Sequence, residues 1–281
     1  MATLVLQGPR LTQPEAEALS ESFKGQLEKC NGYYRIEVNS EVDPQLLALH
    51  KQQEDFDINL LPHGFDPAQV KLLVTDMDST LISIECIDEI ADFINVKPQV
   101  SEITEAAMRG EINFETSLRR RIALLKGLDQ SALDHVYNER LKLNPGAEQM
   151  LSGLKANNIK ITLVSGGFTY FTDKLKARLG LDYTLANTLE FENGKLTGEI
   201  HGHIVGAEAK ADFLQLKCEE LGIETSQAVA MGDGANDLMM MKEAGLSIAY
   251  HAKPKVQAQA HTSLNHCGLE GVLGLLNVGM D

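Results

Sequence analysis

The chain has 281 residues and carries 25 Lys and Arg against 40 Asp and Glu, which gives a formal net charge of −15. A chain of this length predicts about two domains and a core that is stable without disulfides or metals. The acidity argues against surfaces that bind nucleic acid or anionic lipid, because both partners are bound by basic patches.

Residues 1–68 predict a small α+β module in which strands and helices alternate. The predicted elements, in chain order, are TLVLQ, a helix over 14–30, YYRIEV, a helix over 44–53, and a third strand around DINLL. The polar, proline-bearing stretch LPHGFDPAQ at 61–69 has the composition of a linker. We expect this linker to separate the module from the rest of the chain.

Residues 69–281 predict a second, larger domain. Short unbroken apolar runs, typical of strands buried on both faces, recur at VKLLV, IKITLV, AVAM and LSIAY, with helical segments between them. This alternation predicts a doubly wound parallel α/β sheet. Residues 85–143 are helical by pattern and are interpreted as an inserted cap, and Asn193-Gly194 between alternating runs predicts a β-hairpin.

The lengths of the apolar runs and the spacing of the cysteines bear on the cellular compartment of the protein. No apolar run approaches the roughly 18 residues of a membrane-spanning helix, and the first residues lack the basic segment of a secretion signal. The four cysteines, at positions 30, 86, 218 and 267, show no metal-binding or redox spacing. Together these features predict a reduced, cytoplasmic protein.

Two aspartates follow the first apolar run of the larger domain. Asp76 and Asp78, in VTDMDST, come at the carboxyl end of the predicted strand, where open α/β sheets bind ligands. Neighbouring carboxylates repel one another, so the pair needs a cation or a shared proton. The same spacing occurs in Asp55-Phe56-Asp57, but no apolar run precedes it, and we interpret that pair as a surface turn.

A serine and two glycines end the second run. In ITLVSGGF the strand is expected to stop at Ser165, and a helix is expected to begin near Phe168. Backbone N–H groups at Gly166 and at a helix N-terminus favour an anion, and the serine hydroxyl adds a donor. On its own, the segment is equally consistent with a plain strand-to-helix turn.

Two more aspartates and a lysine complete the set of polar groups. Asp233 and Asp237, in GDGAND, follow another predicted strand, and oxygen-rich acidic clusters suit Mg²⁺. Lys210 opens a helix between these motifs, although a single lysine is more often a solvated surface residue. Because parallel strands bring their carboxyl ends to one edge, the motifs together predict a site for a phosphoryl group held between Mg²⁺ and cationic or N–H donors.

The ordered motifs DMDST, SGG, Lys210 and GDGAND resemble those of the haloacid dehalogenase superfamily. The segments IECIDEIA, AAMRGEINFETSLRRR and GDGANDLMMMKEAG narrow the resemblance to the phosphoserine phosphatase family, over about residues 70–281. The resemblance implies a haloacid-dehalogenase-like α/β fold with a helical cap. It also implies hydrolysis of O-phospho-L-serine to L-serine and phosphate, the last step of serine biosynthesis.

The resemblance assigns a role to each site residue. Asp76 is the nucleophile that forms an aspartyl phosphate, and Asp78 is the general acid and base. The residues assigned to Mg²⁺ are Asp76, Asp78 through its backbone carbonyl, Asp233 and Asp237. The residues assigned to substrate are Glu85, Met108, Phe114, Arg121, Ser165, Gly166, Lys210 and Asn236. Among these, Glu85 meets the substrate ammonium and Arg121 its carboxylate; the alternatives are a helix cap and a solvated helix face.

Residues 1–68 resemble, more weakly, the ACT-like regulatory modules that precede some bacterial members of the family. This resemblance implies amino-acid binding, a homodimer formed through the module, or packing alone.

Three other functions stay open from the sequence. A related small-molecule phosphatase or phosphotransferase would use the same residues. A phospho-acceptor signalling module also combines clustered acids, Mg²⁺, a hydroxyl group and a lysine, although Asp78 and the long cap argue against a lasting phosphoryl signal. An amino-acid-binding regulatory protein would bind serine without Mg²⁺-dependent turnover.

Overall fold

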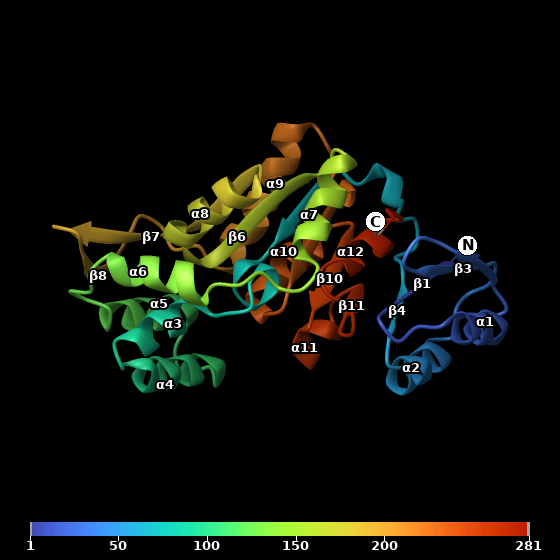
Figure 1. Ribbon diagram of the computed structural model, residues 1–281, viewed down its shortest axis with the longest axis horizontal. Helices are drawn as coiled ribbons and strands as arrows, with labels where there is room; N and C mark the ends of the chain where they lie inside the picture. Colours follow the sequence, from blue (N-terminus) through green and yellow to red (C-terminus); the bar gives the residue numbers. More distant parts are fainter. Residues whose placement is uncertain (1, 280–281) are drawn as a thin grey trace.

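The computed structural model describes residues 2–279, which fold around two β-sheets (Figure 1). The N-terminal segment builds the smaller sheet, which is antiparallel in the order β2-β3-β1-β4. Its elements are β1 (Ala2–Gln7), α1 (Gln13–Ser22), β2 (Gln26–Lys29), β3 (Tyr34–Val38), α2 (Pro44–Gln53) and β4 (Asp57–Leu60). A capping box between Thr12 and Glu15 starts α1, and the Asp43 carboxylate caps α2.

The helix predicted over residues 14–30 is wrong in its second half. α1 ends at Ser22, Lys24 takes a positive φ of 53°, and the chain turns back into the edge strand β2. Because β2 is polar and mostly exposed, it lacks the apolar alternation by which strands are recognised. The segment therefore contains four strands and two helices.

The larger sheet confirms the predicted α/β fold class. Its strand order is β11-β10-β9-β5-β6-β7-β8, and all neighbours are parallel except the β7–β8 hairpin. The strands are β5 (Leu72–Thr75), β6 (Lys160–Phe168), β7 (Tyr183–Glu192), β8 (Lys195–His201), β9 (Ala228–Gly232), β10 (Leu246–Tyr250) and β11 (Thr262–Leu264). The hairpin turns at Asn193 and Gly194, which both have positive φ, as its sequence predicts.

Helices cover both faces of the larger sheet. One face packs against α7 (Ala147–Ala156), α8 (Thr169–Leu179) and α12 (Gly271–Leu275), and the other against α9 (Ala207–Leu221), α10 (Leu238–Glu243) and α11 (Pro254–Gln257). In β5, Leu73 faces the first group and Leu72 and Val74 face the second. Burial on both faces explains the unbroken apolar runs.

The cap lies between β5 and α7 in the chain, and in space beside the β7–β8 hairpin, at the end of the molecule away from the N-terminal segment (Figure 1). It consists of α3 (Cys86–Phe93), α4 (Lys97–Met108), α5 (Phe114–Ala123), α6 (Ser131–His135) and a short π-helical turn at Val136–Arg140. The hairpin supports it: Leu196 accepts a backbone hydrogen bond from Gly127 at 2.7 Å and donates one to Leu128 at 2.8 Å. No helix within residues 2–279 is long and apolar enough to cross a membrane.

The two sheets are joined by buried polar contacts. The interpretation of Asp55-Phe56-Asp57 as a surface turn is wrong for Asp57, which begins β4 and is 3% exposed. Its carboxylate accepts backbone N–H groups from residues 265–267 at 2.8–3.1 Å. Beside it, the Asn59 amide exchanges two hydrogen bonds with the backbone of Ser263, at 2.8 and 2.9 Å.

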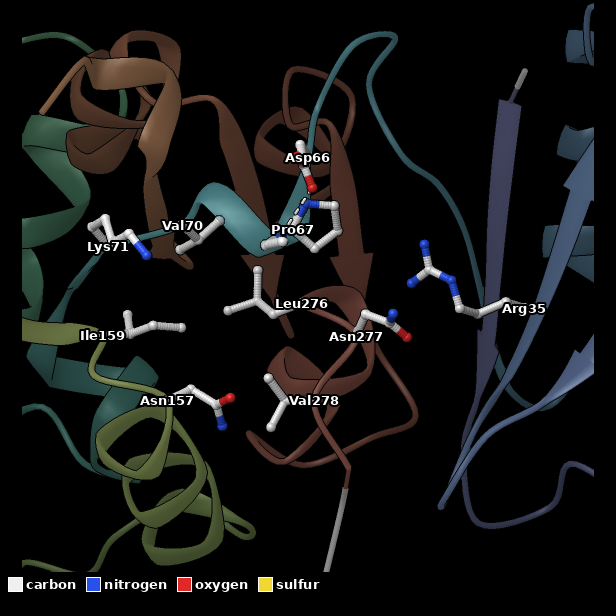
Figure 2. A pocket seen from close by; sticks show the side chains of 11 residues that line it. Arg35, Asp66, Pro67, Val70, Lys71, Asn157, Ile159, Leu276, Asn277 and Val278 are labelled. Carbon is white, nitrogen blue, oxygen red and sulfur yellow. Dashed lines mark hydrogen bonds between the residues drawn. The ribbon is translucent and has the colours of Figure 1, made fainter.

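A cavity of about 500 Å³ is lined by residues of both the N-terminal segment and the larger domain (Figure 2). It is lined by Arg35 of β3, by the start of the larger domain at Val70, and by the end of the chain at Leu276. Val70 and Ile159 come just before β5 and β6, so the cavity is at the amino ends of these strands. The predicted site residues follow the carboxyl ends, at the opposite edge of the sheet.

Candidate active site

Asp76 comes directly after β5 and is almost completely enclosed. Its backbone N–H donates to the Met231 carbonyl at 2.9 Å, which extends the pairing of β5 with β9 by one residue, and the residue is 4% exposed. The chain then turns through Met77–Leu81, with Ser79 at a positive φ of 55°. This tight turn places Asp78 and Thr80 at the same edge of the sheet.

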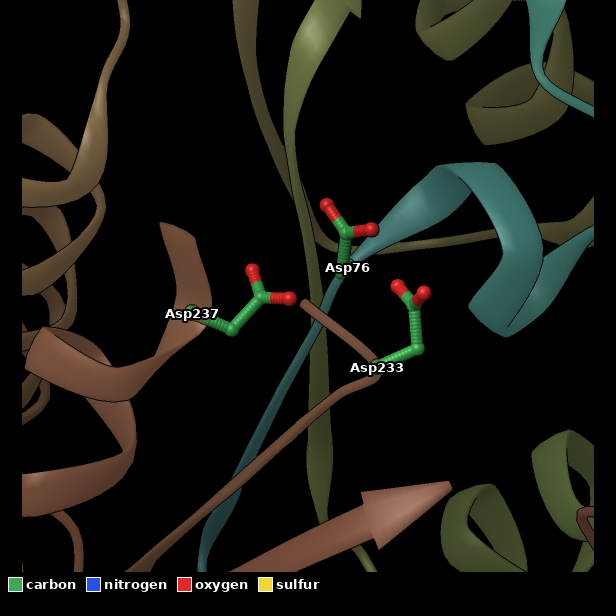
Figure 3. A group of neighbouring side chains, drawn as sticks. All are labelled: Asp76, Asp233 and Asp237. Atoms are coloured by element: carbon green, nitrogen blue, oxygen red, sulfur yellow. The ribbon is translucent and has the colours of Figure 1, made fainter. Parts of the chain in front are cut away.

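Three aspartates converge at this edge (Figure 3). Asp76, Asp233 and Asp237 each offer a carboxylate oxygen, and these oxygens lie within 4.8 Å of one another. The Thr80 hydroxyl donates to Asp233 at 3.3 Å, a contact that the sequence analysis did not include although Thr80 belongs to the DMDST motif. The structure therefore brings together the two acidic motifs, which are separated by more than 150 residues in the chain.

Lys210 is the cation of this cluster and is not a surface lysine. It projects from the first turn of α9, is 0% exposed, and its Nζ lies 2.5 Å from Asp76 Oδ1 and 2.7 Å from Asp237 Oδ1. Burial alone would lower the pKa of Lys210, but the charges of Asp237 and Asp76 outweigh it and raise the pKa above its ordinary value. The lysine is thus a fixed positive charge next to the predicted nucleophile.

The cluster fits a divalent metal ion. Burial, and then the charge of Asp237, raise the pKa of Asp76 well above its usual range, and the same two causes raise the pKa of Asp233 to about 6. Three ionised carboxylates and one ammonium group leave two negative charges, which one divalent cation would offset. The donors are all oxygens, the atoms that hard cations prefer.

The serine–glycine segment lies beside Asp78. Ser165 Oγ donates to Asp78 Oδ2 at 3.3 Å and accepts the Gly167 N–H at 2.8 Å. A side chain at Gly167 would bring its Cβ to 2.8 Å from Asp78 Oδ2, so a larger residue there would displace the Asp78 carboxylate. The helix expected near Phe168 begins one residue later, because β6 continues through both glycines with an irregular pairing to β7.

Asp78 has the surroundings of a proton donor. Its Oδ1 accepts the backbone N–H of Cys86 at 2.9 Å. Burial raises the pKa of Asp78, against the lowering effect of this hydrogen bond. A carboxyl group with a raised pKa next to a buried hydroxyl is suited to exchange a proton during a reaction.

The cap contributes Glu85 and Arg121, whose side chains carry opposite charges when ionised. Glu85 Oε1 accepts the Ser79 hydroxyl at 2.6 Å, and burial followed by the charge of Asp78 raises the pKa of Glu85 to about 7. Arg121 is half-buried and interacts electrostatically with Asp88 most strongly, and then with Glu85 and Asp78. Its Nε has no hydrogen-bond partner within residues 2–279. An unpaired guanidinium nitrogen at this depth is available to a ligand.

The remaining predicted residues differ in what they contact. Phe114, at the start of α5, is 39% exposed, and a Cβ at Gly166 would lie 3.1 Å from its ring. Asn236 donates to Asp237 Oδ1 at 3.4 Å and so borders the acidic cluster. Met108 ends α4, and its side chain lies outside the described part of the structure.

The chain resembles known proteins in sequence and in fold. The sequence profile of the haloacid dehalogenase-like hydrolases matches residues 70–245. A phosphoserine phosphatase from Polaromonas sp. (strain JS666) is 51% identical over 224 residues, which cover 78% of this chain and 95% of the relative.

Two solved structures extend the comparison. A haloacid dehalogenase-family hydrolase from Salmonella enterica serovar Typhi aligns with a TM-score of 0.90 at 33% identity, over 98% of this chain and 99% of its own. A phospho-aspartyl intermediate analogue of a phosphoserine phosphatase aligns with a TM-score of 0.69 at 41% identity, over 73% of this chain and 98% of its own. The arrangement of both sheets therefore recurs in the first of these structures.

Proposed function

The chain belongs to the haloacid dehalogenase-like hydrolases and, among them, to the phosphoserine phosphatases, and from this premise we propose that it hydrolyses O-phospho-L-serine to L-serine and phosphate. The observation that supports the proposal is that Glu85, which accepts the Ser79 hydroxyl, and Arg121, whose buried Nε has no partner within residues 2–279, both interact electrostatically with Asp78. An acid and a guanidinium at this place match the ammonium and the carboxylate of a phosphorylated amino acid.

Asp76 is the proposed nucleophile. One of its carboxylate oxygens attacks phosphorus while the bond from phosphorus to the serine oxygen breaks, which leaves an aspartyl phosphate. Lys210 holds Asp76 in place from Oδ1 and supplies positive charge to the phosphoryl oxygens. Ser165 and the Gly166 backbone bind the same oxygens.

Asp78 is the proposed acid and base. Its raised pKa keeps a proton available, which it gives to the serine oxygen as this group leaves. In the second step Asp78 takes a proton from water, and the water oxygen attacks phosphorus and frees Asp76. The cap excludes bulk water from the first step.

We propose that the acidic cluster holds Mg²⁺ through Asp76, Asp233, Asp237 and the backbone carbonyl of Asp78. When bound, the ion offsets negative charge on the carboxylates and on the phosphoryl oxygens. Because burial favours the neutral form of Asp76, the ionised nucleophile depends on Lys210 and on this cation. Removal of divalent ions with a chelator is therefore expected to abolish turnover, and addition of Mg²⁺ to restore it.

We further propose that residues 1–68 are an ACT-like module, that residues 69–281 are the catalytic domain with its cap at about 85–143, and that the protein is cytoplasmic. The antiparallel sheet with two helices supports the first assignment. The exposed edge strand β2 is a surface through which this module would form a homodimer. Sedimentation of the full chain tests the dimer.

A phosphate-release panel tests the function. O-phosphoserine, O-phosphothreonine, O-phosphoethanolamine and a sugar phosphate are each incubated with the full chain, with and without Mg²⁺. We expect many turnovers with O-phosphoserine, dependence on Mg²⁺, and the highest kcat/KM for this ester. A single turnover that leaves a stable phosphoprotein would instead support a phospho-acceptor module. Faster hydrolysis of the sugar phosphate would contradict the substrate assignment.

A further inference from the structure

Asn187 is a buried polar side chain that the proposed mechanism does not use. It lies in β7, is 1% exposed, and belongs to none of the motifs read from the sequence. Its amide forms two hydrogen bonds with backbone groups of other segments. Nδ2 donates to the Gly166 carbonyl at 2.8 Å, and Oδ1 accepts the Val205 N–H at 2.8 Å.

The first of these bonds fixes one peptide group of the phosphate-binding segment. The carbonyl of Gly166 and the N–H of Gly167 belong to the same peptide group and point in opposite directions. Asn187 holds the carbonyl, and Ser165 Oγ accepts the N–H at 2.8 Å. If this peptide rotated, the Gly166 oxygen would be free to turn toward the phosphoryl oxygens and repel them.

Ser165 connects this peptide to the general acid. Because Ser165 Oγ accepts the Gly167 N–H, its proton is directed away from that bond, and Asp78 Oδ2 lies 3.3 Å away. Asn187 and Ser165 are both at most 1% exposed. Water does not replace a bond that is lost at this depth, so the arrangement depends on each partner being present.

The second bond connects the same amide to the segment that carries Lys210. Val205 precedes Gly206, the residue at which α9 begins, and Lys210 lies one turn further along the helix. The Asn187 side chain therefore lies between two segments and bonds to both: the phosphate-binding segment at Gly166, and the residues that lead into the helix of Lys210. Phe114 of the cap lies over both, because a Cβ at Gly166 or Gly206 would come within 3.1 or 3.5 Å of its ring.

We infer that Asn187 is a positioning residue for phosphate binding. It holds the Gly166 carbonyl away from the phosphoryl group and sets the distance between the serine–glycine segment and the helix of Lys210. It acts through backbone groups and does not contact the substrate. The inference rests on the proposed function only in that the site binds a phosphoryl group, whichever ester carries it.

Asn187→Asp is the most direct test. The substitution keeps the size of the side chain and an acceptor for the Val205 N–H, but places a carboxylate oxygen against the Gly166 carbonyl. Asn59→Asp is a matched control, since Asn59 is 0% exposed and also bonds one backbone carbonyl and one backbone N–H, both of Ser263. The control lies at the contact between the two sheets, where Asn59 bonds to the edge strand β11, two strands away from β9.

The full-length variants are compared with saturating Mg²⁺. The measurements are kcat and KM for O-phosphoserine and for p-nitrophenyl phosphate, the dissociation constant of inorganic phosphate, and the melting temperature. We expect Asn187→Asp to lower kcat/KM for both esters by the same factor, about 10- to 100-fold, and to weaken phosphate binding. Asn59→Asp is expected to lower the melting temperature with unchanged kcat/KM and phosphate affinity.

A merely structural role predicts a different pattern. Equal losses of activity in the two variants, or a lower melting temperature with unchanged phosphate affinity in Asn187→Asp, would overturn the inference. If Asn187→Asp does not fold, Asn187→Ser, which is smaller and uncharged, supports the same comparison. A wild-type protein that hydrolyses p-nitrophenyl phosphate but not O-phosphoserine would contradict the proposed substrate and leave the Asn187 test intact.

Discussion

Arg119, Arg120 and Arg121 follow one another in α5, yet only the last is turned away from solvent. Arg119 pairs with Glu115 at 3.0 Å on the exposed side of the helix, and Arg120 is exposed. Arg121 is half-buried, and desolvation lowers its pKa against the charges of the nearby acids. Three identical side chains thus have different environments because the helix turns by about 100° per residue.

We expect Arg121→Ala to raise KM for O-phosphoserine by about 10- to 100-fold, since a charge-assisted hydrogen bond to the substrate carboxylate is lost. O-phosphoethanolamine, which lacks that carboxylate, is expected to keep its KM. Arg120→Ala is the control and should change neither value. Steady-state phosphate release with both esters gives the comparison, and equal effects of Arg121→Ala on the two esters would exclude the proposed contact.

Asp76→Asn tests the nucleophile. The amide keeps the shape of the side chain but cannot form the acyl phosphate, so kcat is expected to fall by about 10³-fold or more. Acid-stable labelling with ³²P-phosphoserine should disappear together with turnover. Circular dichroism checks that the variant is folded, and a folded variant with normal turnover would refute the assignment.

The raised pKa of Glu85 predicts a pH dependence. Below about pH 7 Glu85 is neutral and does not offset the substrate ammonium, whereas above it the charged carboxylate does. We compare O-phosphoserine with 3-phosphoglycerate, which has a hydroxyl group in place of the ammonium. The ratio of their kcat/KM values is expected to rise as the pH increases through about 7.

Glu85→Gln should make this ratio independent of pH, and a ratio that stays pH-dependent in this variant would assign the titration to another group.

The raised pKa of Glu85 also affects the stability of the fold. Because the folded protein holds the Glu85 proton up to about pH 7 and the unfolded chain releases it near 4.5, this residue lowers stability as the pH rises between the two values.

At the scale of elements, the sequence located the strands that carry the site. Runs such as VKLLV and AVAM are short and are followed within two residues by Asp or Gly, which marks both the strand and its carboxyl end. Burial on both faces by helices produces this pattern. The edge strand β2 is mostly exposed on both faces, so its sequence lacks this pattern and is compatible with the predicted helix.

The details of the site depend on tertiary contacts that local sequence does not encode. Taken alone, Lys210 is also compatible with the surface. The motifs around it and the family resemblance place it in the site, and its burial follows from its contacts with Asp76 and Asp237. The continuation of β6 past Ser165 depends on pairing with β7. Asn187 carries no motif, and only its two backbone partners reveal its position.

The contact between cap and sheet gives a prediction for Phe114. Phe114→Ala removes the ring that lies over Gly166, so the closed cap is expected to be less stable and KM to rise for both O-phosphoserine and O-phosphoethanolamine, by about 3- to 10-fold. Phe93→Ala is the control, because Phe93 is also a cap residue, is 43% exposed, and stacks on His135. If both variants raise KM equally, the Phe114 contact has no special role.

At the scale of the whole molecule, the two sheets are held together by buried polar groups and by an apolar contact, in which Val5 and Leu61 pack into the core of the larger domain. Asp57→Asn would exchange the charged acceptor of the N–H groups of residues 265–267 for a neutral one, and we expect the free energy of unfolding to fall by about 1–3 kcal/mol. Proteolysis in the linker at 61–69 should become faster, while kcat/KM stays unchanged. Urea titration measures the free energy of unfolding, and limited digestion measures the rate of cleavage in the linker.

Asp55→Asn is the matched control for this prediction. Asp55 lies two residues away and pairs with Arg10, but both side chains are more than 60% exposed, so the pair contributes at most about 1 kcal/mol. Equal destabilisation by the two substitutions would show that the Asp57 carboxylate is no special link between the sheets.

The partners of the N-terminal module lie at the end of the chain, and this affects how the protein is made. Asp57, Asn59 and Tyr33 bond to residues 263–277, which are synthesised more than 200 residues later. At ribosomal speed this interval is about 10–40 s. A module that folds during this interval exposes its docking surface, which combines these hydrogen-bonding groups with the apolar side chains of Val5 and Leu61. The polar groups keep this surface hydrated, whereas a fully apolar surface would favour association between nascent chains.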